Sequence, residues 1–156
     1  MSNSSWTLDV FVSLSSALTA VSTNQLKPKL DPIGIADQYF ATLNSNVSAS
    51  TLDSVGAAFQ SATSPTQAAE TILQDPVLGP VARSIMKLWL LGAWYSPSNP
   101  MSAVKVVSAQ AYKESLVWKV MQSHPMGYSM FTFGYWGKAP PPLDQFILPA
   151  QTSAAN

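Results

Sequence analysis

The chain has a single histidine, His124, as a candidate base for chemistry near neutral pH. A serine-type catalytic triad needs such a histidine to take the proton of the nucleophile. His124 precedes Pro125, and a proline cannot continue a helix, so the histidine is expected on a turn that ends a helix. A small hydrolase built on His124 is one interpretation. A histidine that caps a helix or contacts a partner protein is the interpretation that we favour.

Residue sets that bind metals or cofactors are missing from the sequence. The chain has no cysteine, which excludes disulfides, thiolate metal sites and thioether-linked haem within it. Common zinc sites take three or four ligands, mostly His and Cys, more than one histidine can supply. Glu70, Asp75 and Glu114 fall in separate segments, and Gly127, Gly134 and Gly137 do not form a dinucleotide fingerprint. No cofactor or metal is therefore expected in this chain.

Aromatic residues are concentrated near the carboxyl terminus, in the stretch SHPMGYSMFTFGYWGKAPPP at residues 123–142. This cluster is open to three interpretations: the core of the domain itself, a platform that stacks on sugars, or an anchor for a partner protein. Tyrosine and tryptophan bury large areas at low entropic cost, and a proline-rich backbone has little freedom left to lose. We favour the anchor, with these expected partner-binding residues: Trp118, His124, Tyr128, Phe133, Tyr135, Trp136 and Pro140.

Charged residues are scarce in the 156-residue chain, at 10% of the sequence, where soluble domains have about 25%. Eight basic and eight acidic residues cancel, so no net field attracts nucleic acid or an anionic membrane. A small neutral secreted domain is one explanation of the deficit. A surface largely covered by another protein is the explanation that we favour.

Apolar residues recur with helical periodicity over most of the chain and must build the scaffold that holds the aromatic cluster. The pattern predicts helices over residues 7–21, 30–44, 48–60, 64–73 and 75–92. Four sequence signals are expected to fix helix ends: Asp31 before Pro32, Ser50 with Asp53, Ser64 with Gln67, and Gly92 at a left-handed end.

Further predictions concern which face of two helices is buried and which elements form after residue 102. In the first helix Ser15 and Ser16 fall opposite the apolar stripe, and in the helix over 75–92 Val77 is expected to point inward. Residues 103–107 are β-branched enough for a short strand or an irregular extended piece, and the pattern over residues 109–121 predicts one further helix. The segment Ile85–Tyr95 is the most apolar, but it is too short to span a bilayer, so no transmembrane segment is expected.

These patterns predict a mainly α fold. We expect a compact bundle of about five or six short helices with an irregular, aromatic, Pro/Gly-rich carboxyl-terminal arm. Residues 1–138 are expected to form a single helical domain, and residues 139–156 an extended arm.

Several stretches, taken in order, resemble a known family. They are DVFVSLSSALTA, LWLLGAWY, AYKESLVWKVMQSHPMGY and FGYWGKAPPP. Together they are similar to the small subunit of the membrane-bound, FAD-dependent sugar and polyol dehydrogenases of bacteria, which include sorbitol, fructose and glucose dehydrogenases. The resemblance covers most of the chain and is weakest between residues 44 and 71.

The resemblance implies a non-catalytic role beside two partners. In that family a large, GMC-type flavoprotein subunit holds FAD and oxidises the substrate, and a multihaem cytochrome c subunit passes the electrons to ubiquinone. The small subunit stabilises the flavoprotein and assists its export to the periplasmic side of the inner membrane. The closeness of SLVWKVMQSHPMGY to the sorbitol enzymes makes D-sorbitol the first expected substrate.

Two features depart from the family pattern. No pair of adjacent arginines occurs, so a twin-arginine presequence is expected either to have been cleaved or to be left out of this sequence. Some relatives join the small and large subunits by a disulfide, whereas a chain without cysteine relies on packing. The alternative from a different functional class is an independent carbohydrate-binding module that uses Trp94, Tyr135 and Trp136, or another protein-interaction module.

Overall fold

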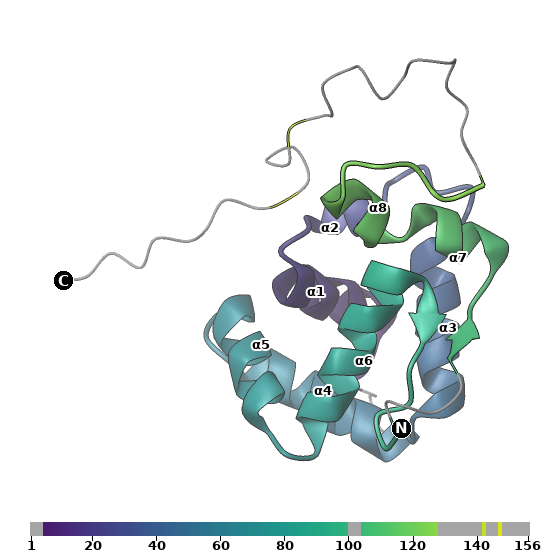
Figure 1. Cartoon of the computed structure of the whole chain (residues 1–156). Coiled ribbons are helices and arrows are strands. Elements are labelled where there is room, and N and C mark those ends of the chain that lie inside the picture. Colours follow the sequence, from purple (N-terminus) through teal and green to yellow (C-terminus); the bar gives the residue numbers. More distant parts are fainter. Residues whose placement is uncertain (1–4, 100–103, 128–141, 143–146, 148–156) are drawn as a thin grey trace.

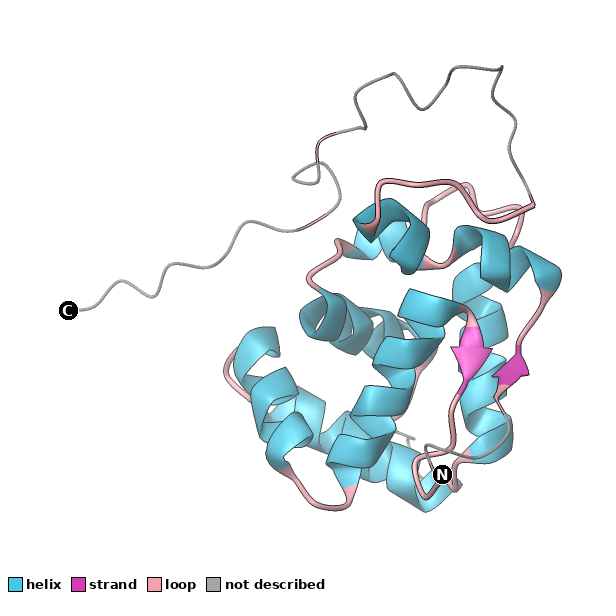
Figure 2. Ribbon diagram, viewed as in Figure 1, coloured by secondary structure: helices cyan, strands magenta, loops and turns pink. Residues whose placement is uncertain are grey.

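A computed structural model describes residues 5–99, 104–127, 142 and 147 of the chain. The described part is mainly helical, as predicted, with one pair of very short strands (Figures 1 and 2). The five longer helices are α1 (Leu8–Thr19), α3 (Ile35–Asn46), α4 (Ala49–Ser61), α5 (Pro65–Gln74) and α6 (Leu78–Leu91). The shorter elements are α2 (Thr23–Leu26), β1 (Ala93–Trp94), β2 (Lys105–Val106), α7 (Ala109–Glu114) and α8 (Leu116–Val120).

Helix α6 forms the centre of the bundle and contacts α1, α3, α4, α5 and α8 (Figure 1). Its apolar stripe supplies Ile85 and Leu88, both fully buried, to the core. Trp89 of α6 stacks on Phe11 of α1 and meets Tyr39 of α3 edge-on, with ring centroids 6.0 and 4.9 Å apart. Burial of such large side chains is the main stabilising contribution to a bundle of this size.

The predicted capping signals are confirmed at two helix ends and wrong at two others. The Ser64 hydroxyl accepts a hydrogen bond from the Gln67 amide at the start of α5, and Gly92 ends α6 with φ +64°. Asp31 instead caps the turn before α3, where its carboxylate accepts from the Ile33 and Gly34 amides, and α3 begins at Ile35. The cap of α4 is Ser48 rather than Ser50.

The structure also corrects three predictions of exposure and continuity. Ser15 is fully buried because its hydroxyl donates to the Phe11 carbonyl oxygen at 2.7 Å, which satisfies it inside the core, and Ser16 is 9% exposed. Val77 is 67% exposed because it precedes the first turn of α6. The predicted helix over 109–121 breaks into α7 and α8 at Ser115, whose φ and ψ of −59° and 139° are not helical.

The predicted strand near residues 103–107 is confirmed as β2, which pairs antiparallel with β1 in the register Ala93 opposite Val106. No strand is predicted at β1 from the sequence. Helix α7 follows β2 directly and passes close to Gly92, where a Cβ atom would fall on the Ala111 carbonyl oxygen. This close approach places α7 and α8 across the end of α6 (Figure 1).

Within the described residues, no helix has both the length and the apolar character needed to cross a bilayer. The predicted boundary at residue 138 lies outside these residues, and the structure does not test the division into domain and arm.

Candidate functional site

Of the predicted partner-binding residues, Trp118 and His124 fall within the described part of the chain. The others, Tyr128, Phe133, Tyr135, Trp136 and Pro140, lie outside the described residues.

Trp118 lies on α8, half-buried against α7. Its indole Nε1 donates to the Tyr112 carbonyl oxygen at 2.8 Å, and its ring meets the Tyr112 ring edge-on with centroids 5.3 Å apart. The same carbonyl also accepts from the Ser115 hydroxyl at 2.9 Å and from the Ser115 amide, so three donors meet at the end of α7. The polar atom of Trp118 therefore joins α7 to α8, and only its half-exposed ring is left to meet a partner.

His124 is half-buried on the segment after α8. Its Nδ1 lies 3.1 Å from the carbonyl oxygen of the next residue, Pro125. This nitrogen faces a backbone group, whereas in a catalytic triad it faces the orienting carboxylate. The geometry at His124 thus favours a local structural contact over the hydrolase interpretation.

Within the described ranges no group of three His, Cys, Asp or Glu side chains is arranged to hold a metal ion.

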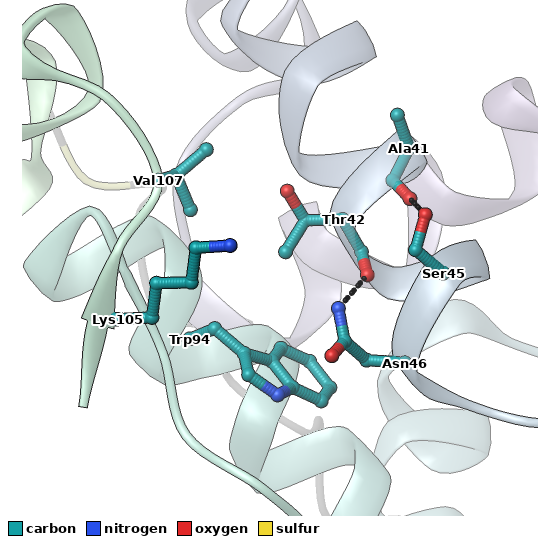
Figure 3. A pocket seen from close by; sticks show the side chains of 7 residues that line it. All are labelled: Ala41, Thr42, Ser45, Asn46, Trp94, Lys105 and Val107. Atoms are coloured by element: carbon teal, nitrogen blue, oxygen red, sulfur yellow. Dashed lines mark hydrogen bonds between the residues drawn. The ribbon is translucent and has the colours of Figure 1, made fainter. Parts of the chain in front are cut away.

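A polar cleft of about 280 Å³ lies between α3 and the strand pair (Figure 3). Trp94 and Lys105 face Thr42, Ser45 and Asn46 across it. The α3 side chains are turned onto their own helix: Ser45 donates to the Ala41 carbonyl at 2.9 Å, and Asn46 donates to the Thr42 carbonyl at 2.7 Å.

Trp94 in this cleft is 8% exposed, which bears on the carbohydrate-binding alternative. A sugar-stacking platform needs an accessible ring face, and Trp94 is mostly covered. Tyr135 and Trp136, the other residues of that alternative, lie outside the described residues.

Two adjoining grooves run along the face formed by α2, the 27–33 loop and α8. The first groove, of about 190 Å³, is lined by the 28–33 loop, Trp89, Glu114 and Leu116. The second groove lies between the ends of α1, α6 and α8 and includes Val21, Leu90, Val120 and Ile147. Gln25, Leu116 and Lys119 line both grooves, so the two form one continuous surface, here called the apolar face.

Large hydrophobic side chains stand unusually exposed on the apolar face. Leu30 is 90% exposed and Val120 is 51% exposed, and Ile33 at 39% lies beside Leu30 in the first groove. Met121, just before the aromatic stretch, and Met126, within its first residues, are also exposed. An exposed hydrophobic cluster of this kind in a chain with few charges is typical of a protein-interaction surface.

The floor of the first groove contains an indole N–H without an acceptor. Trp89 is 4% exposed, and its Nε1 has no hydrogen-bond partner in the described structure. Leaving such a donor buried and unpaired costs about 1–3 kcal/mol. The floor of the first groove therefore holds a buried donor whose hydrogen-bonding capacity is not met.

Tyr39 lies under the same end of the bundle and is fully buried. Its hydroxyl donates a long hydrogen bond of 3.4 Å to the Ala111 carbonyl oxygen. Burial raises the pKa of Tyr39 far above its ordinary value, and the negative charge of Glu114 raises that pKa further. Tyr39 therefore stays neutral in the folded protein and serves to fix α7 against α3.

Comparison of the chain with protein-family models, with curated proteins and with solved structures gives no match. The resemblance to dehydrogenase small subunits therefore stays a prediction from the sequence stretches that carry it.

The sequence interpretation missed the apolar face because it placed Leu30 at the start of a helix. One signal was available: Leu30 stands between Lys29 and Asp31 and before Pro32, where no helical stripe can include it. A large hydrophobic residue in so polar a loop indicates a contact made outside the domain core.

Proposed function

We propose that this chain is the small, non-catalytic subunit of a heterotrimeric FAD-dependent sugar alcohol dehydrogenase, with D-sorbitol as the first expected substrate. The chain stabilises the large GMC-type flavoprotein subunit and assists its export. Electrons pass from FAD through the haem c subunit to ubiquinone at the periplasmic side of the bacterial inner membrane. The chain itself binds neither FAD nor haem.

The observation that carries the proposal is the apolar face. Leu30 is 90% exposed and lies beside the exposed Ile33 in an open groove. This favours a subunit whose apolar face is covered by a partner protein in the working complex. The scarcity of charge points the same way, since a partner-covered surface does not need charge for solubility. The ordered sequence stretches identify the kind of partner.

The proposal is tested by tagging the chain in its native host and identifying what co-purifies. We expect a yellow flavoprotein and a haem c protein, with sugar alcohol oxidation in the complex. The isolated chain is expected to show neither flavin absorbance nor dehydrogenase activity. Stoichiometric FAD in the isolated chain, or recovery of the chain without any flavoprotein, would contradict the proposal.

A titration of the isolated chain with sugars separates the proposal from a carbohydrate-binding module. A module binds sugar without a partner, so saturable binding of a mono- or oligosaccharide to the lone chain would favour that alternative. We expect no saturable binding.

A further inference from the structure

We propose that the second groove is the seat of the chain's own carboxyl-terminal segment, residues 143–148, which docks there within the same molecule. The consequence is that the aromatic stretch between Gly127 and this segment is tethered to the bundle at both ends.

The contact that carries the inference is that of Ile147. This residue lines the second groove together with Val21, Leu90 and Val120, although it follows α8 by more than 25 residues. Its side chain keeps 41% of its surface exposed, about as much as Ile33, so it is only partly covered and leaves room for the rest of the segment to pack. Apolar contact of this kind provides the driving force for docking.

The sequence around Ile147 matches the groove in hydrophobicity. The segment LDQFIL places Leu143, Phe146 and Leu148 close to Ile147, and these are the last large apolar residues of the chain. The apolar walls of the groove come from Val21 after α1, from Leu90 of α6, and from Leu116 and Val120 of α8. An apolar segment thus meets an apolar surface that would otherwise face water.

The charges are complementary as well. Asp144 is the only charged side chain between residues 139 and 156. Lys119 lines both grooves beside Val120 and has no ion-pair partner among the described residues. Asp144 precedes Ile147 by three residues, at most about 11 Å along the chain, which is within reach of a lysine next to Val120. Pairing of Asp144 with Lys119 would fix the direction of the docked segment.

The docking of residues 143–148 does not depend on the proposed function. Its effect on binding of the flavoprotein rests on that function. Tethering both ends of the aromatic stretch reduces the conformational entropy that the stretch loses when a partner binds. The first groove and Leu30 stay uncovered for the flavoprotein.

The test uses the absence of cysteine, which makes introduced thiols unique. The full-length double variant Val120→Cys with Ile147→Cys is treated with a short bismaleimide, and crosslinks within one molecule are measured by mass spectrometry. The matched control is Val77→Cys with Ile147→Cys, because Val77 is also exposed but lies at the other end of α6, about 20 Å away. We expect at least a roughly tenfold higher crosslink yield for the first pair.

Charge reversal gives a second readout in the same variant. Adding Lys119→Glu is expected to lower the crosslink yield, and adding Asp144→Lys to that variant is expected to restore it. Equal yields for the Val120 and Val77 pairs would overturn the inference. Crosslinks between two molecules at the Val120 pair would also overturn it, since they would show a second copy in the groove.

The outcome is distinguishable from that of the proposed function. A crosslink in the isolated chain that captures no flavoprotein leaves the docking intact and rejects the dehydrogenase role. A chain that captures the flavoprotein but gives no crosslink rejects the docking and retains the role.

Discussion

Gly92 connects the central helix to the strand pair at the point where α7 crosses the chain. Its φ of +64° is in the left-handed region, and the space beside it is filled by the Ala111 and Tyr112 backbone. Gly34 has the same φ, yet a Cβ there would meet nothing closer than an Asp37 carboxylate oxygen at 3.8 Å. A side chain at Gly34 would therefore meet only the strain of a left-handed backbone. A side chain at Gly92 would meet that strain and a steric clash with nearby backbone atoms as well.

Replacing each glycine by alanine is expected to give unequal losses of stability. Gly34→Ala introduces left-handed strain alone and should lower the free energy of unfolding by about 1 kcal/mol. Gly92→Ala adds a collision with backbone atoms and should lower it by about 3 kcal/mol. Urea unfolding followed by circular dichroism measures both values. Equal losses would show that α7 does not approach Gly92 as described.

Tyr39 gives the protein a specific sensitivity to alkaline pH. Its folded pKa is raised, first by burial and then by Glu114, above the ordinary value of 10.0 that it has when unfolded. The stabilisation is fully present below pH 10 and is lost as the pH rises further, because the unfolded chain then releases a proton that the folded protein retains. The slope from this group approaches about 1.4 kcal/mol per pH unit.

Tyr39→Phe removes this sensitivity together with the long hydrogen bond to Ala111. At pH 7 the variant should be less stable than the wild type by about 1 kcal/mol. Between pH 10 and 11 the wild type should lose more stability than the variant, so the difference between them should shrink. Urea unfolding at pH 7, 9, 10 and 11 tests this, and a constant difference at all four values would contradict it.

At the scale of the elements, helix ends are set by single hydroxyl groups. Ser48 precedes α4 with extended backbone, and its hydroxyl accepts from the Thr51 amide at 3.2 Å. Ser50, two residues later, lies inside the first turn, where its hydroxyl contacts that of Ser48. The Ser50 and Asp53 spacing resembles a capping box, but the cap of α4 lies two residues earlier, at Ser48.

The cap assignment predicts a difference between two neighbouring serines. Ser48→Ala should lower the free energy of unfolding by about 1 kcal/mol, because the Thr51 amide loses its acceptor. Ser50→Ala should change it by only a few tenths of a kcal/mol, since alanine is favourable in a helix. Thermal and urea unfolding of both variants measure the difference. A larger loss in Ser50→Ala would place the start of α4 elsewhere.

At the scale of the whole molecule, the apolar face and the scarcity of charge belong together. Leu30 and Val77 are both strongly exposed, at 90% and 67%, but they lie in different pockets of the surface. Leu30 borders the first groove, whereas Val77 lies beside Pro80 and Ser96. A partner that covers the apolar face would bury Leu30 and leave Val77 in water.

Leu30→Asp is therefore expected to weaken binding of the flavoprotein by roughly 30-fold or more, because an acidic group would replace a buried anchor. The matched control Val77→Asp should leave binding within about twofold, and both variants should melt near the wild-type temperature because both sites are exposed. Pull-down of the flavoprotein, with circular dichroism of each variant, measures these outcomes. Normal binding by a folded Leu30→Asp protein would exclude the apolar face as the site of attachment.

The sequence alone determined the features that depend on neighbours along the chain. Helical periodicity predicted the five longer helices, because one buried stripe per helix repeats every 3.6 residues whatever the partner. The signals at Ser64 and Gly92 were predicted for the same reason, since a cap involves residues within one turn.

Only the tertiary structure decided the features that need residues distant in sequence. Val77 and Leu30 are both hydrophobic, and only the packing of α6 and of the 27–33 loop leaves them outside the core. The closeness of Gly92 to Ala111 and the break at Ser115 accompany the crossing of α7 and α8 over the end of α6, and the same crossing brings Val120 to the groove that Ile147 also lines. Periodicity reports which face of a helix is buried, but the loops and close approaches depend on how the helices pack against one another.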